Sequence, residues 1–357
     1  MKLKGVTYDA GSVSEGGFSW RPDFDLPTVR RELQIIRNDL NCNAVRITGR
    51  DLRRVAASAQ AALGQGLEVW LSPALWGEDP HETLQYTVEA AKLAETLRNG
   101  MRGKVVFVIG GELTLFMRGI IEGKTLRSRM SNPRLFPIIK GGEHNKPLNE
   151  YLAKANAAVR QVFHGEVSYD SLVWEKVDWS LFDYVGVDHY RAAKIEDRYL
   201  EMLKPSFSFG KPVVVTEFGY TTTRGGMNEE GLLGSAGLGG NSAIDGFSLF
   251  LHNRLPVFGR LVRPHLNGDH VRDEGWQAHK LVETLQLLDN AGVEGAFVST
   301  FIFQIEPFSE DPHYDLDMVS ASLVKYFEGG KRGKTYPDMR WEPKESFRAV
   351  AGYYANH

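Results

Sequence analysis

The sequence has one cysteine and no long hydrophobic run, and both facts limit what the protein can be. Cys42 has no partner for an intrachain disulfide, which suits a reducing compartment. No apolar stretch approaches the roughly 20 residues that a membrane-spanning helix needs. The first residues, MKLKGVTYDAG, lack the apolar centre of a signal peptide. We therefore expect a cytoplasmic protein with no membrane partner.

An excess of charge of one sign is also missing. The 357 residues carry a formal net charge of −3, so there is no electrostatic case for nucleic acid as a partner. Hydrophobic residues make up 42% of the chain, and a chain of this length can bury one large core. We expect residues 1–357 to form a single domain.

Short apolar segments recur along the chain, and helical patterns separate them. The predicted strands are 3–8, 43–48, 67–71, 104–110, 166–169, 184–188, 211–216 and 295–301. The predicted helices are 27–39, one from about 52, 80–99, 148–163, 194–203, 274–290 and 346–353. Strands that are apolar on both faces are typical of parallel sheets. Eight such units predict an α/β fold, the (β/α)8 TIM barrel.

A doubly wound open sheet is the alternative fold. No Gly-x-Gly-x-x-Gly turn follows the first predicted strand, which weakens a dinucleotide-binding version of that fold. We expect no cofactor.

Three connections are too long for plain turns, and all three follow strands. They are 116–147 after strand four, 221–273 after strand seven and 304–340 after strand eight. In a barrel they lie on the C-terminal face, where active sites form. The glycine-rich piece GLLGSAGLGG, 231–240, is a candidate lid. Long loops around the site favour a closed pocket and exo action on a short substrate.

Two predicted strands run into a glutamate, in KVVFVIGGEL and VVVTEFGY. Glu217 has the parity of Val213 and Val215, so all three should point the same way, and Glu112 follows its own apolar strand similarly. Two carboxyl groups across a cleft suit glycosidic bond cleavage, because an ionised one attacks the anomeric carbon while a protonated one donates to the leaving oxygen. A separation of about 5 Å indicates retention, and about 6.5–9.5 Å indicates inversion.

These strand ends resemble those of the clan A retaining glycoside hydrolases, which are (β/α)8 barrels. The resemblance implies that Glu217 is the nucleophile and Glu112 the acid/base. Arg46 in NAVRIT is similar to the family's arginine that orients the nucleophile. His189 and Tyr190, after strand six, resemble the His or Tyr often present there.

The chain departs from that pattern at two places. Gly111 stands where the family usually has an Asn that binds the sugar 2-hydroxyl, and strand eight has Phe301 and Phe303 where the family tends to have Trp. The sequence also resembles a group of actinobacterial proteins often labelled abortive-infection proteins.

Each supporting residue also has a purely structural interpretation. Arg46 needs a carboxylate partner in either case, because an unpaired buried arginine is costly. His189 could be a satisfied rim histidine, and Tyr190 could pack or could orient the nucleophile. Trp20 and Trp76 would stack on sugar faces or cap the barrel. Tyr8, with Asp9 beside it, is a weaker substrate-binding candidate at the end of strand one.

The favoured hypothesis is a retaining glycoside hydrolase acting by double displacement on a small saccharide or glycoside. A second hypothesis is a metal-dependent sugar-processing barrel. In it, one divalent ion would be bound by Glu112, Asp188, His189 and Glu217. No second histidine with ligand-like spacing supports it, so we expect no metal site. A third is a catalytically altered barrel that binds a saccharide or a protein partner.

The string HYDLDM, 313–318, invites a metal assignment of its own. A calcium loop would need more oxygen ligands and a glycine. We interpret Asp315 and Asp317 as carboxylates that shape a loop.

Overall fold

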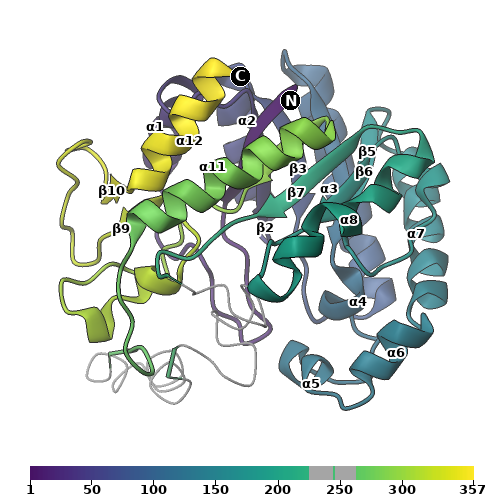
Figure 1. Ribbon diagram of the computed structural model, residues 1–357. Coiled ribbons are helices and arrows are strands. Elements are labelled where there is room, and N and C mark those ends of the chain that lie inside the picture. Colours follow the sequence, from purple (N-terminus) through teal and green to yellow (C-terminus); the bar gives the residue numbers. More distant parts are fainter. Residues whose placement is uncertain (225–243, 246–262) are drawn as a thin grey trace.

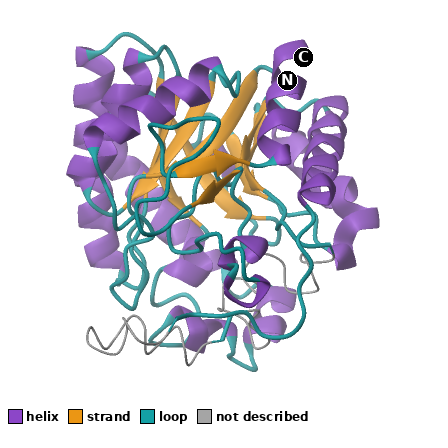
Figure 2. Cartoon of the chain, turned by 90° about the vertical axis from the view of Figure 1, so that its left-hand side faces the viewer, coloured by secondary structure: helices purple, strands orange, loops and turns teal. Residues whose placement is uncertain are grey.

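The computed structural model describes residues 1–224, 244–245 and 263–357. Eight parallel strands close into a barrel in chain order, which confirms the predicted (β/α)8 fold. Figure 2 shows the strands in the centre with helices on either side. The strands are β1 Leu3–Asp9, β2 Ala44–Gly49, β3 Glu68–Pro73, β4 Val105–Gly111, β5 Glu166–Leu172, β6 Val185–Asp188, β7 Val213–Phe218 and β8 Gly295–Val298.

The first three helices around the barrel each begin after a capping aspartate. Asp25, Asp51 and Asp79 cap the first three helices by accepting hydrogen bonds from backbone N–H groups.

Between β5 and β6 there is only the short 3-10 helix η1, Trp179–Leu181. The main helices are α1 Leu26–Asn38, α2 Leu52–Gly64, α3 Pro80–Gly100, α7 Asn145–Arg160, α8 Tyr199–Leu203, α11 Glu274–Ala291 and α12 Glu345–Asn356.

The long connections after β4 and β8 carry structure of their own. Segment 116–147, predicted as a loop, holds two short helices, and α7 begins before its predicted start. Figure 1 shows these helices at the lower right, beyond the carboxyl ends of the strands. The candidate lid 231–240 lies outside the described residues. The short elements are α4 Leu113–Phe116, α5 Leu126–Met130, α6 Leu135–Gly141, η2 Ala193–Arg198, η3 Lys204–Phe209, η4 Pro312–Tyr314, η5 Leu316–Val319, β9 Val324–Tyr326 and β10 Trp341–Pro343.

Alternation along the strands divides the core into two layers. Side chains on the outer face of the barrel pack against the helices in one large apolar cluster. Those on the inner face fill the amino-terminal half of the barrel. This inner cluster consists of Leu3, Ala44, Trp70, Val106, Val108, Tyr184, Val214 and Phe297. The carboxyl half of the barrel interior is polar, and it forms the floor of the site described below.

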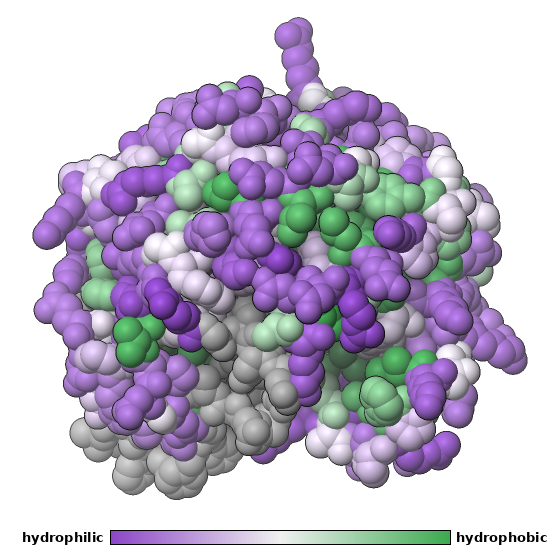
Figure 3. Space-filling view, viewed as in Figure 1, coloured by the Kyte–Doolittle hydropathy of each residue, from purple (hydrophilic) through white to green (hydrophobic). Residues whose placement is uncertain are grey.

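Apolar groups on the surface are few among the described residues. Phe136, Phe209 and Val271 are the exposed large hydrophobic side chains there. The face in Figure 3 is mainly hydrophilic, with small hydrophobic patches. Of the helices in the described ranges, none combines the length and apolar character needed to cross a membrane.

Candidate active site

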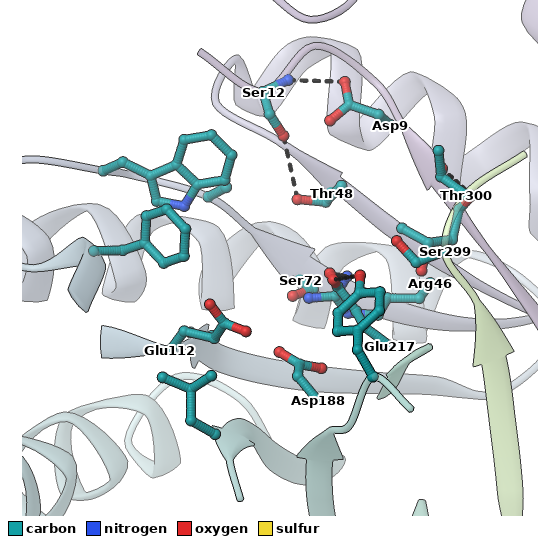
Figure 4. Close-up of a pocket in the computed structure, with 18 of the residues that line it drawn as sticks. Asp9, Ser12, Arg46, Thr48, Ser72, Glu112, Asp188, Glu217, Ser299 and Thr300 are labelled. Carbon is teal, nitrogen blue, oxygen red and sulfur yellow. Dashed lines mark hydrogen bonds and ion pairs between the residues drawn. The ribbon is translucent and has the colours of Figure 1, made fainter. Parts of the chain in front are cut away.

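A cavity of about 440 Å³ opens at the carboxyl ends of the strands. Its size lies within the range of roughly 300–1,000 Å³ typical of small-molecule sites. Glu112, Glu217, Arg46 and Tyr190 all border it, and Figure 4 shows both glutamates facing the same space.

A β-bulge turns Glu217 into this cavity. Val213 and Val215 belong to the outer cluster, while Val214 belongs to the inner one. The register between β6 and β7 shifts after Val187, so that Asp188 faces Glu217. The expectation that Glu217 points the same way as Val213 and Val215 is therefore wrong, because the extra residue re-aims the strand end.

Two donors hold the carboxylate of Glu217. Arg46 Nη1 donates to Oε1 over 2.6 Å, and the Tyr190 hydroxyl donates to Oε2 over 2.7 Å. Arg46 is 4% exposed, and its position on β2 points it across the barrel interior. These two contacts use both oxygens of Glu217 and fix its orientation.

Asp170 is a residue that the sequence reasoning missed. It lies on β5, is fully buried, and receives hydrogen bonds from Arg46 Nε at 2.8 Å and from Ser72 at 3.2 Å. The sequence predicts one carboxylate partner for Arg46, and the structure gives it two, Asp170 and Glu217. A charged residue in the middle of EVSYDSL was the available signal.

Glu112 is held in place by its backbone. It adopts the left-handed conformation, with φ 49° and ψ 38°, directly after β4. Such a conformation costs a non-glycine residue about 1–3 kcal/mol and persists where neighbours impose it. Here Glu112 N donates to Asp170 O at 2.9 Å, and Leu113 N donates to the Tyr169 hydroxyl at 2.9 Å.

The protonation of Glu112 follows from where its carboxyl group lies. Burial in the pocket raises its pKa well above the ordinary value, and the negative charges of Glu217 and Glu175 raise it further. Part of the residue still faces the cavity. Glu112 is therefore suited to donate a proton.

Asp188 lies beside Gly111, the last residue of β4. A side chain at Gly111 would place its Cβ 3.7 Å from Arg46 Nη2 and 3.8 Å from Asp188 Oδ2, which are ordinary contacts. Asp188 Oδ1 accepts a hydrogen bond from Thr216 at 2.7 Å. Burial raises the pKa of Asp188 well above its usual range, and the charge of Glu217 adds to the rise.

An aromatic group forms one wall of the cavity. The rings of Trp20 and Trp76 lie 4.6 Å apart, Trp20 meets Phe303 at 5.0 Å, and Trp76 stacks on Phe116 at 4.9 Å. All four residues border the cavity. Phe301 instead packs outside the barrel against Trp341, at 5.3 Å.

Tyr8 does not belong to the site, and its prediction is corrected. It is fully buried in the outer cluster, and its hydroxyl donates to Glu32 on α1 over 2.5 Å. Side chains on β1 alternate, so Thr7 and Asp9 border the cavity while Tyr8 faces the helices.

His189 matches its structural interpretation. Its ring stacks on Tyr199 with centroids 4.0 Å apart, and Nε2 lies 2.8 Å from the Tyr199 carbonyl oxygen. Burial lowers its pKa to about 4, so it is neutral at pH 7. The residue borders the cavity, but its imidazole is engaged elsewhere.

The acidic residues of the segment 313–318 shape a loop. Arg272 pairs with Asp315 at 2.9 Å and with Asp317 at 2.6 Å, and Lys344 also reaches Asp317. Within the described ranges, no group of three or more His, Cys, Asp and Glu side chains is arranged to hold a metal ion.

The comparisons with known proteins establish the fold. No family model matches the chain, and no curated protein sequence matches it. Among solved structures, a GH113 β-1,4-mannanase in a complex has a TM-score of 0.58 at 13% identity, with 99% of each chain covered. The GH113 β-mannanase AaManA from Alicyclobacillus acidocaldarius has a TM-score of 0.54 at 13% identity, covering 99% of this chain and 97% of that one.

A further similar structure belongs to a longer protein. The β-glucuronidase of Ruminococcus gnavus has a TM-score of 0.58 at 13% identity, and the chain covers 50% of it. At these identities the shared feature is the barrel.

Proposed function

We propose that the protein is a retaining glycoside hydrolase in which Glu217 is the nucleophile and Glu112 the general acid and base. The observation that carries this proposal is that Glu217 and Glu112 border one cavity but have contrasting surroundings. Arg46 and Tyr190 hold Glu217, whereas burial and nearby negative charge favour a protonated Glu112. Such a pair of carboxyl groups is what double displacement needs.

The reaction would run in two steps. First, a Glu217 oxygen attacks the anomeric carbon, the bond to the leaving oxygen breaks, and Glu112 gives that oxygen its proton. Then Glu112, now a carboxylate, takes a proton from water, the water oxygen attacks the anomeric carbon, and the bond to Glu217 breaks. Both residues return to their starting state.

The substrate in this proposal is a small glycoside or oligosaccharide cleaved from one end. The aromatic group of Trp20, Trp76, Phe116 and Phe303 borders the cavity and offers apolar ring faces to a sugar. The similar structures named as β-1,4-mannanases and a β-glucuronidase put aryl β-mannosides and β-glucuronides first in a test panel, followed by β-glucosides and the α-anomers.

The test is turnover of this panel, with NMR of the first-formed sugar anomer. Retention of configuration and loss of turnover in Glu217→Ala are expected. Azide should rescue Glu217→Ala with formation of a glycosyl azide of inverted configuration, since the small anion replaces the missing nucleophile. Glu201→Gln, on an exposed position of α8, is the matched control and should behave as the wild type.

Three results would reject the proposal. They are full activity in Glu217→Ala, an inverted product from the wild type, and tight sugar binding without product after long incubation. The last would favour the saccharide-binding barrel.

A further inference from the structure

One side of the cavity carries a buried carboxylate oxygen with no donor in the described protein. Asp9, at the end of β1, is 5% exposed and borders the cavity. Its Oδ1 accepts hydrogen bonds from the backbone N–H groups of Gly11 at 2.7 Å and Ser12 at 2.9 Å. Its Oδ2 has no hydrogen-bond partner among the described residues and almost no accessible surface, so a ligand reaches it only after a small rotation of the side chain. Because an unsatisfied buried oxygen is costly, a donor from outside the protein is expected.

Two threonines extend this polar surface. Thr7, two residues earlier on the same face of β1, is 3% exposed, and its Oγ1 also lacks a partner among the described residues. Thr48 lies opposite Asp9 in the β1–β2 register, and its hydroxyl is 3.4 Å from that of Ser12, a long contact. Thr7 and Thr48 both border the cavity. They add two hydroxyl-bearing side chains, one on β1 and one on β2, to the part of the cavity wall that holds Asp9.

The polar surface at Asp9 and Thr48 lies across the cavity from the two glutamates (Figure 4). In Figure 4, Asp9, Ser12 and Thr48 are grouped on one side of the pocket, and Glu112 and Glu217 lie on the other. The Trp20 ring borders the same cavity. A glycosyl unit has hydroxyl donors along its edge and an apolar C–H face. The cavity offers Asp9 as an acceptor for the hydroxyls and the Trp20 ring for the C–H face.

The charge of the cavity bears on which sugar fits. Burial raises the pKa of Asp9, and it raises the pKa of Glu306, another cavity carboxyl, to about 8. Five carboxyl side chains, Asp9 and Glu306 among them, border the cavity against the two cations of Arg46 and Lys194, so added negative charge is disfavoured there. A neutral glycosyl unit therefore fits better than one that carries a carboxylate.

We propose that Asp9, Thr7 and Thr48 form a subsite that binds the hydroxyl groups of a neutral glycosyl unit, with Asp9 Oδ2 as an acceptor. The subsite rests on the proposed function for its role in turnover. It concerns binding, however, and binding can be measured without turnover.

The experiment is calorimetric titration of the Glu217→Gln variant with 4-nitrophenyl β-mannoside, β-glucoside and β-glucuronide. The last two probes differ only at C6, and the glucoside should bind more tightly than the glucuronide. Adding Asp9→Asn keeps an oxygen for Gly11 and Ser12 but puts an amide donor at the Oδ2 position. It should weaken binding of the neutral probes about tenfold or more.

Thr7→Val is the second variant, because it removes a hydroxyl that has no partner in the described protein. It should weaken binding severalfold without lowering Tm, and it decides the question if Asp9→Asn fails to fold. Asp269→Asn, at an exposed position, is the matched control and should change neither affinity nor Tm.

Four outcomes would overturn the subsite. They are no binding of any probe, tighter binding of the glucuronide than of the glucoside, unchanged affinity in both variants, and a lower Tm with unchanged affinity. Asp9-dependent binding in a protein that hydrolyses nothing would keep the subsite and reject the hydrolase. Hydrolysis that is insensitive to Asp9→Asn would do the reverse.

Discussion

Glu112 and Glu217 are the same residue type at corresponding strand ends, yet their surroundings are opposite. Glu217 receives hydrogen bonds on both oxygens, from Arg46 and Tyr190. The Glu112 side chain receives none from the described residues and lies near the charges of Glu217 and Glu175. The comparison teaches that neighbours, not residue type, decide which carboxyl group is held as an acceptor and which keeps a proton.

The largest expected difference between the two glutamates is in how the loss of kcat/KM in each variant depends on the leaving group of the substrate. Glu217→Gln should lose on the order of 10⁴-fold or more in kcat/KM with every substrate, because no nucleophile remains. Glu112→Gln should lose roughly 10²–10⁴-fold with poor leaving groups and far less with 2,4-dinitrophenyl glycosides, which need no proton. Steady-state kinetics on paired substrates measures this. Equal losses of kcat/KM in both variants on both substrates would contradict the different roles assigned to Glu217 and Glu112.

Arg46 should be the next most sensitive residue, through stability. Arg46→Met leaves Asp170 buried without its cation and removes one donor from Glu217, so it should lower the free energy of unfolding by about 3–5 kcal/mol. Arg53→Met, whose side chain is 93% exposed, is the control and should stay within about 0.5 kcal/mol of the wild type. Denaturant titration measures both. Similar small changes in the two variants would mean that Arg46 does not support the site.

Tyr190→Phe should have a smaller effect, confined to the Glu217 side of the comparison. It removes the hydroxyl that donates to Oε2, so kcat/KM should fall about tenfold to a hundredfold while the stability changes little. Tyr353→Phe removes a similar bond, from the hydroxyl of Tyr353 on α12 to Asp289 on α11 at 3.1 Å, and should leave kcat/KM unchanged. An equal loss of activity in the two variants would count against a role for Tyr190.

Glu175→Gln should give the smallest effect, on the Glu112 side. Burial raises the pKa of Glu175 to about 7, so above that pH its charge contributes to the raised pKa of Glu112. The acid is active when protonated, so activity falls as pH rises through the pKa of Glu112. Removing the charge lowers that pKa and should move the alkaline limb of kcat/KM down by a few tenths of a pH unit to about one.

The pH–rate profile of Glu175→Gln checks this shift, with Glu201→Gln as the reference. A limb that stays in place or moves to higher pH would contradict the assignment.

The sequence alone was sufficient for the barrel and for the two strand-end glutamates. Period, spacing and apolar runs are local properties, and they predict β4 and β7 with their final carboxyl groups without knowledge of the neighbours. The predicted need of Arg46 for a carboxylate also follows from local chemistry, since a charge inside a strand must be paired.

Tertiary structure decided which way the strand ends face and what surrounds them. The bulge that turns Glu217 inward depends on pairing between β6 and β7, and Asp170 meets Arg46 only across the closed barrel. The parity of β1 places Asp9, not Tyr8, at the cavity. Contacts between residues far apart in the chain set these positions and the raised pKa of Glu112, so no local pattern could have supplied them.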